Sequence, residues 1–103
     1  MIILVDIDGT ICDTPENNDY TKAVPIKGNI KKINELYDKG YRIEYWTGRG
    51  RETGINWMNL TMKQFKEWGV KYHQLKFQKP YDVVIDNNAI NVKDLDKIEE
   101  FLK

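Results

Sequence analysis

The first stretch of the chain, residues 2–7, is an almost continuous run of apolar side chains that is interrupted only by Asp6. A short apolar run without helical periodicity is typical of a strand buried on both faces of a parallel sheet. Three further runs with aromatic or β-branched residues, at 41–46, 72–75 and 82–85, predict three more strands. The pattern therefore predicts a sheet of four strands.

Apolar residues that recur at helical spacing predict three helices. The first covers residues 30–37 and is stopped by Gly40, and the second covers 57–68 and is stopped by Gly69. The third is a final amphipathic helix over residues 95–102.

Residues 9–28 separate the first strand from the first helix, and their glycines, prolines and asparagines predict a long loop. The order of elements is then strand, helix, strand, helix, strand, strand, helix. This alternation predicts an α/β fold with a mostly parallel sheet and right-handed crossovers. Because 103 residues suffice for one core and leave no room for a second, residues 1–103 are expected to form a single domain.

Polar side chains follow the predicted strands at their carboxyl ends, where ligands bind in sheets of this kind. Asp6 and Asp8 end the first strand, Thr47 follows the second, and Asp86 closes the fourth. Because alternate residues of a strand point the same way, Asp6 and Asp8 are expected to leave the sheet together. The sequence thus predicts one site at this edge of the sheet.

The acidic pair carries the most specific chemistry in the chain. Two carboxylates this close repel each other unless a cation lies between them or they share a proton. A carboxylate is also one of the few side chains that can attack phosphorus. The alternative is an acidic turn that only contacts solvent. The pair directly follows Ile-Ile-Leu-Val and precedes Gly9-Thr10, and this context favours the functional interpretation.

The composition argues against several classes of partner. Lysine plus arginine and aspartate plus glutamate both number 16, so the formal net charge is zero and offers no global attraction to nucleic acid. The single cysteine excludes an internal disulfide. The apolar start is too short for a signal sequence, and no stretch approaches the roughly 20 apolar residues of a membrane span. We therefore expect a cytoplasmic protein that does not enter a membrane.

The segment Asp-Ile-Asp-Gly-Thr at 6–10 resembles the first motif of the haloacid dehalogenase (HAD) superfamily, most of whose members are Mg²⁺-dependent phosphohydrolases. Thr47 after an apolar strand is similar to the second motif, Lys79 before a proline to the third, and Asp86 after Val-Val-Ile to the fourth. The resemblance spans residues 4–88, with the four motifs in the expected order.

The resemblance implies that Asp6 attacks phosphorus to form an aspartyl-phosphate, and that Asp8 first protonates the leaving oxygen and then deprotonates water. It also implies an Mg²⁺ ion bound by the carboxylates of Asp6 and Asp86 and by the backbone carbonyl of Asp8. Many relatives carry a second acidic residue after the fourth motif, whereas Asn87 and Asn88 follow Asp86 here. We therefore expect weaker Mg²⁺ binding with activity retained.

The remaining site residues are expected to contact the substrate. Lys79 would offset charge on the phosphoryl oxygens, and Thr47 with the backbone amide of Gly48 would hydrogen-bond one of them. Arg49 and Arg51 form a local basic spot. Either arginine could contact substrate anions, or the loop that carries them could simply be solvated.

The resemblance further implies a Rossmann-like three-layer sandwich without a cap domain, because neither 11–40 nor 48–78 has room for an inserted cap. The short length and motif segments look most like small phosphatases of capsule and surface-polysaccharide biosynthesis, which implies a small sugar-phosphate substrate. An open site must be covered either by a large substrate or by a neighbouring subunit, and we expect a homo-oligomer in which a neighbouring subunit covers part of the site.

Two alternative functions stay open at this point. One is a phosphatase that acts on a macromolecular phosphoester, either a nucleic-acid end or a phosphoprotein, although the neutral charge argues against nucleic acid. The other is a non-catalytic phosphate-binding module. Cys12 is expected to be a small buried residue, and His73, in a short strand, is expected to be structural.

Overall fold

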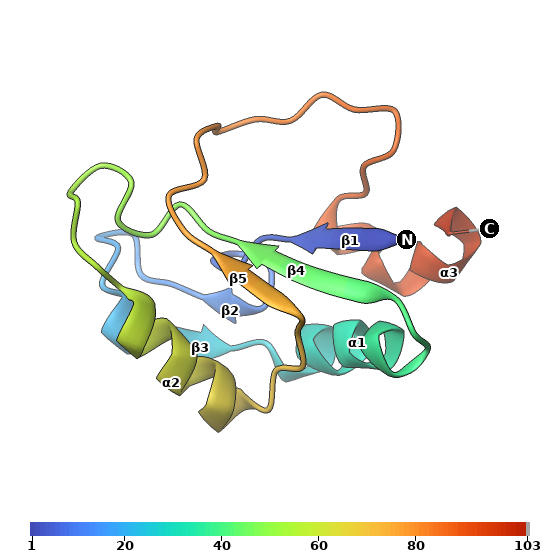
Figure 1. Cartoon of the computed structure of the whole chain (residues 1–103), viewed down its shortest axis with the longest axis horizontal. Coiled ribbons are helices and arrows are strands. Elements are labelled where there is room, and N and C mark those ends of the chain that lie inside the picture. The colour runs from blue at the N-terminus through green and yellow to red at the C-terminus, as the bar shows by residue number, and fades with distance from the viewer. Residues whose placement is uncertain (103) are drawn as a thin grey trace.

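A three-stranded parallel sheet with the order β1-β4-β5 forms the centre of the computed structural model, which describes residues 1–102 (Figure 1). Its strands are β1 (Ile2–Val5), β4 (Arg42–Trp46) and β5 (Gln74–Lys76). The register places Val5 beside Tyr45. All three carboxyl ends therefore meet at one edge of the sheet, as predicted. β1 ends at Val5, two residues earlier than expected, because the chain turns at Gly9 and Thr10 and begins to leave the sheet before them.

Two helices, α1 (Lys27–Asp38) and α2 (Met58–Trp68), lie on the same side of this sheet (Figure 1). The α1 side chains predicted to share one face are buried: Ile30, Ile33 and Leu36. On α2, Phe65 packs edge-to-face against Tyr45 of β4, with ring centroids 5.0 Å apart. The predicted stop of α2 is confirmed, since Gly69 ends the helix in the left-handed conformation with φ +70°.

The opposite face of the sheet carries charged side chains. Glu44 of β4 forms ion pairs with Arg42 at 2.7 Å and with Lys76 of β5 at 3.3 Å.

The η2 turn (Val92–Lys97), which leads into α3 (Ile98–Phe101), contacts α1. The structure thus confirms an α/β fold with a parallel sheet, while the three-layer sandwich is not confirmed.

The segment predicted as a long loop, 9–28, contains short regular structure. β2 (Cys12–Asp13) pairs antiparallel with β3 (Val24–Pro25), and a 3-10 turn, η1 (Tyr20–Lys22), lies between them. The prediction was wrong here because two-residue strands carry no periodicity that a sequence pattern can reveal.

The predicted fourth strand at 82–85 is absent, and this prediction was wrong. The side chain of Val83 is 77% exposed and that of Ile85 is 99% exposed. Since all three apolar side chains between Asp82 and Asp86 stay exposed, this segment buries little apolar surface to offset the entropy of ordering its backbone as a strand. β1 therefore stays at the edge of the sheet, where Ile2 is 62% exposed.

The predicted final helix at 95–102 is instead divided between η2 and α3. The backbone leaves helical geometry at Asp94 inside η2. Leu95 and Ile98 are nevertheless buried, as the amphipathic pattern predicts. Within residues 1–102, no helix combines the length and apolar character needed to cross a membrane.

Tyr45 lies fully buried between the sheet and α2, and within the part of the chain that the structure describes its hydroxyl has no hydrogen-bond partner. Burial raises the pKa of this phenol far above its usual range. Replacement Tyr45→Phe removes the unpaired polar atom, so we expect the free energy of unfolding to stay unchanged or rise by about 1 kcal/mol in urea titrations. Tyr72→Phe is the matched control, because this neighbouring ring is only partly buried. A clear loss of stability in Tyr45→Phe would contradict the prediction.

Candidate active site

Asp6, the first residue after β1, has a partly open carboxylate with one cation beside it. The Asp6 side chain is 40% exposed, and Nζ of Lys79 lies 3.3 Å from its Oδ1. Lys79 is placed there by the backbone, because its N–H donates to the carbonyl of Thr47 at 2.9 Å. This hydrogen bond joins the chain that follows β5 to the chain that follows β4. The structure thus brings Asp6 and Lys79 together, as the sequence predicts.

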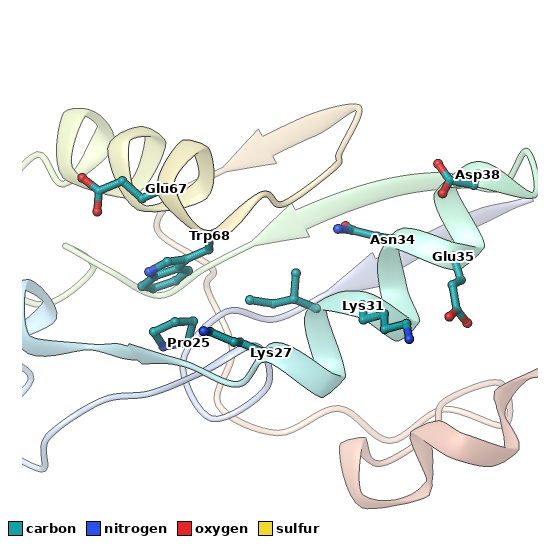
Figure 2. A pocket seen from close by; sticks show the side chains of 9 residues that line it. Pro25, Lys27, Lys31, Asn34, Glu35, Asp38, Glu67 and Trp68 are labelled. Carbon is teal, nitrogen blue, oxygen red and sulfur yellow. The ribbon is translucent and has the colours of Figure 1, made fainter.

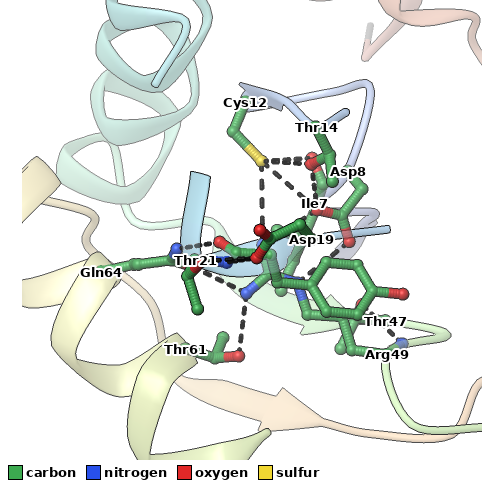
Figure 3. Close-up of polar contacts among 11 residues, drawn as sticks. Ile7, Asp8, Cys12, Thr14, Asp19, Thr21, Thr47, Arg49, Thr61 and Gln64 are labelled. Atoms are coloured by element: carbon green, nitrogen blue, oxygen red, sulfur yellow. Dashed lines mark hydrogen bonds and ion pairs between the residues drawn. The ribbon is translucent and has the colours of Figure 1, made fainter. Parts of the chain in front are cut away.

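Asp8 is held by a different cation, Arg49, in a two-pronged ion pair (Figure 3). Nε of Arg49 donates to Oδ2 of Asp8 at 3.0 Å, and Nη2 donates to Oδ1 at 2.9 Å. The hydroxyl of Thr14 also donates to Oδ1, at 2.6 Å. Burial raises the pKa of Asp8, but the hydrogen bonds from Arg49 and Thr14 outweigh it and hold that pKa below its usual value.

Each carboxylate of the acidic pair therefore has its own cation. Lys79 offsets the charge of Asp6, and Arg49 offsets the charge of Asp8. These two cations offset the repulsion expected between neighbouring carboxylates, so the pair does not need to share a proton. The two aspartates differ in their surroundings, because Asp6 is the more exposed at 40% against 25% for Asp8.

Thr47 and Gly48 begin the turn that follows β4. The Thr47 side chain is buried, and its Oγ1 accepts a hydrogen bond from the backbone N–H of Arg49 at 3.1 Å. Gly50 is needed farther along this turn, since its φ is +82° and a Cβ there would lie 2.3 Å from the carbonyl oxygen of Ile55. The turn is thus tightly fixed, and it carries the side chain of Arg49 inward to Asp8.

A groove of 600 Å³ runs along the open edge of β1 and has Asp6, Thr10, Lys79 and Asp86 among its lining residues. The structure thus places the first, third and fourth predicted motif residues in one groove. Asp86 lies on the exposed 82–88 segment, where its Oδ1 accepts a hydrogen bond from the backbone N–H of Asn88 at 2.9 Å. Asp8, Thr47 and Arg49 do not line this groove.

The oxygen atoms of the predicted metal ligands suit a hard cation such as Mg²⁺. The acidic residues of 1–102 nevertheless form no group of three or more that is placed to hold an ion. Asp6 and Asp86 fit the metal by their chemistry and by lining one groove.

A second groove, of 540 Å³, lies between α1 and α2 (Figure 2). It is lined by Trp68, Pro25 and charged side chains of both signs. None of the predicted site residues lines it, and its mixed charges do not favour a phosphate. We therefore place the candidate site at the carboxyl ends of the strands.

Comparison with known proteins bears on the fold. No family profile matches the chain, and no curated protein matches it. A crystal structure of a structural-genomics target protein from Vibrio cholerae is similar to it, with a TM-score of 0.86 and 22% sequence identity. The match covers 98% of this chain and 93% of that protein. At this identity the likeness shows a shared fold.

Sequence reasoning missed the residues that surround Asp8 and Arg49. Thr14 could not be found, because nothing in the sequence ties it to Asp8. Thr61 and Gln64 gave a usable signal, since they are polar residues at the same helical spacing as the buried Phe65. Polar side chains on a buried helix face need partners, and both of these contact Arg49 (Figure 3).

Three other predicted residues have clear places. Cys12 is fully buried, and its surroundings raise the pKa of its thiol to about 11, mainly through desolvation, so it is an inert core residue as expected. His73 accepts a hydrogen bond from the backbone N–H of Ile43 at 3.0 Å and stacks on Tyr37, which is a structural role. Arg51 forms an ion pair with Asp82 and donates a hydrogen bond to the carbonyl of Lys79, and these contacts fix the position of the chain after β5.

Proposed function

We propose that this protein is a Mg²⁺-dependent phosphohydrolase of the HAD type, which hydrolyses a phosphoric monoester through an aspartyl-phosphate on Asp6. One observation carries the proposal. An accessible carboxylate at the carboxyl end of the parallel edge strand β1 lies 3.3 Å from a lysine, and a second, ion-paired carboxylate follows two residues later. Asp6 is 40% exposed beside a groove that is also lined by Asp86, so a phosphate has access to its carboxylate.

In this mechanism the Asp6 carboxylate oxygen attacks phosphorus, and the bond from phosphorus to the leaving oxygen breaks. Lys79 offsets negative charge on the phosphoryl oxygens. The leaving oxygen takes a proton from the carboxyl of Asp8. Asp8, now a carboxylate, takes a proton from water as that water attacks phosphorus, and the bond to Asp6 breaks. We also propose that Thr47 and the Gly48 amide hydrogen-bond a phosphoryl oxygen, as the resemblance implies, although neither residue lines the groove.

The lowered pKa of Asp8 bears on both steps. A carboxylate is the form needed to activate water in the second step. The first step needs the acid form, and an incoming phosphate dianion favours it, since a nearby negative charge raises the pKa of a carboxyl group. Substrate binding is therefore expected to favour the protonated form of Asp8.

Mg²⁺ would be held by the carboxylates of Asp6 and Asp86 and by the backbone carbonyl of Asp8. When bound, it supplies positive charge that neutralises the transferring phosphoryl group. Asn87 adds an amide where a second acid would add a charge, so we propose a weak metal site.

The resemblance to small phosphatases of surface-polysaccharide biosynthesis implies a sugar-phosphate substrate, and the open site limits what can cover it. The groove along β1 has no inserted cap over it in residues 1–102, so a small sugar phosphate would need a second subunit to exclude water. We propose such a substrate and a homo-oligomer that covers the site with the 9–28 segment. A monomer that prefers a phosphopeptide or a phosphorylated oligonucleotide would instead be covered by its substrate.

The test is a panel of sugar phosphates, a 5′-phosphorylated oligonucleotide and a phosphopeptide, each assayed for released phosphate with Mg²⁺ and with excess chelator. We expect turnover of at least one sugar phosphate with Mg²⁺ and loss of about a hundredfold or more on chelation. Light scattering on the same sample gives the oligomeric state.

Restored turnover on adding back Mg²⁺ is the control for damage by the chelator. Turnover that is insensitive to chelation contradicts the metal assignment. Phosphate binding without turnover of any substrate would favour the non-catalytic module instead.

A further inference from the structure

Arg49 is completely buried, with a side chain that is 0% exposed, and its guanidinium contacts the carboxylate of Asp8 (Figure 3). A guanidinium has five N–H donors, and all five have acceptors within hydrogen-bond distance. Two go to Asp8, two from Nη1 go to Thr61 at 3.0 Å and Gln64 at 2.7 Å, and the last reaches the sulfur of Cys12 at 3.9 Å. No donor is left for a substrate.

The two oxygens of Asp8 are used unequally. Oδ1 has three donors nearby, from Arg49, Thr14 and, more weakly, Cys12 at 3.5 Å. Oδ2 has one, from Nε of Arg49. A carboxylate oxygen accepts about two hydrogen bonds, so Oδ1 is saturated and Oδ2 keeps one acceptor position.

The support behind Arg49 is itself fixed. Gln64 uses its Nε2 to donate to the carbonyl of Tyr20 at 2.6 Å, so its Oε1 is held toward Arg49. The ring of Tyr20 lies 4.6 Å from the guanidinium carbon of Arg49. The guanidinium thus connects α2 and the η1 turn to the carboxylate of Asp8.

We propose that Arg49 is a positioning residue for proton transfer, which holds Asp8 so that Oδ2 is the oxygen that gives and takes the proton. The inference rests on the proposed phosphohydrolase function. It gives Arg49 a different role from the substrate contact that the sequence suggests. It also predicts an effect that depends on the leaving group, because only a poor leaving group needs a proton.

The test compares Arg49→Lys with the unaltered protein in single-turnover assays on an alkyl phosphate and on p-nitrophenyl phosphate. Lysine keeps the charge but cannot span both oxygens of Asp8. We expect the alkyl phosphate to react about a hundredfold more slowly, p-nitrophenol release to slow by less than about threefold, and KM to change by less than about twofold. Arg42→Gln, which removes an exposed arginine from its ion pair with the buried Glu44 at the start of β4, is the matched control.

Other results overturn the inference. A raised KM with equal losses on both substrates would make Arg49 a substrate ligand. If the rates on both substrates fall equally and the thermal midpoint of unfolding also falls, the role of Arg49 is only structural. If Arg49→Lys does not fold, then Gln64→Met and Thr61→Val each remove one acceptor of Nη1. These variants should show the same dependence on the leaving group with losses of about threefold to tenfold.

A readout without activity separates this inference from the proposed function. Crystal structures of the unaltered protein and of Arg49→Lys should show the Asp8 carboxylate rotated in the variant while Asp6 and Lys79 keep their places. An unmoved Asp8 carboxylate overturns the positioning role. If the unaltered protein hydrolyses no phosphoester, the proposed function fails, and the position of Asp8 still decides whether Arg49 holds it.

Discussion

Replacement of Asp6 by asparagine is expected to abolish phosphoester turnover and leave the fold intact. The amide has nearly the same size, but it lacks the charge that attacks phosphorus. We expect kcat to fall by about a thousandfold or more, as losses of a nucleophile do. Lys79 loses its partner, but both side chains are partly exposed, so stability should fall by no more than about 1 kcal/mol.

The measurement is steady-state turnover of the best substrate together with trapping of the covalent intermediate. The unaltered protein should yield a phosphoenzyme that hydroxylamine cleaves, as an acyl phosphate requires, and peptide mapping should place it on Asp6. Asp38→Asn is the matched control, because Asp38, the last residue of α1, forms an exposed ion pair with Lys71. Mass spectrometry must exclude deamidation back to aspartate. Retained turnover in a clean Asp6→Asn sample would refute the nucleophile.

Much of the sheet could be predicted because its strands and helices bury continuous apolar faces. Residues 2–5 and 42–46 are paired in the structure, and the face of α1 packs as its spacing predicts. The pattern failed at 82–85, where three apolar residues resemble a strand but their side chains stay exposed. A sequence shows the propensity of such a segment, but not whether the neighbouring strand provides enough contacts to order it.

The meeting of Asp6 and Lys79 at one edge of the sheet was also predictable, since the carboxyl ends of parallel strands lie at the same edge. The sequence predicted that Lys79 lies near Asp6, and it does, although 72 residues separate the two along the chain. It could not assign Arg49. An arginine in a glycine-containing turn looks solvated, and only the three-dimensional contacts show that the turn directs it inward to Asp8. The polar residues Thr61 and Gln64 on the buried face of α2 were the one sign in the sequence that a buried polar partner such as Arg49 lies beside them.

Replacement of Asp8 by asparagine is the second large effect, and it separates the two halves of the reaction. The amide cannot take a proton from water, so a phosphorylated Asp6 should accumulate. We expect steady-state turnover to fall by about a hundredfold to ten-thousandfold, while a first burst of p-nitrophenol persists because that leaving group needs no proton. Rapid-mixing assays measure the burst, and acid quenching measures the phosphoenzyme.

The Asp8→Asn variant also leaves the buried Arg49 without its anion, which is expected to cost about 3 kcal/mol of stability. The double variant Asp8→Asn with Arg49→Met removes both charges and should recover part of that loss in urea unfolding without recovering turnover. This pair of measurements separates a chemical role of Asp8 from a structural one. If Asp8→Asn hydrolyses an alkyl phosphate at the unaltered rate, then Asp8 only anchors Arg49, and the proton must move through another group.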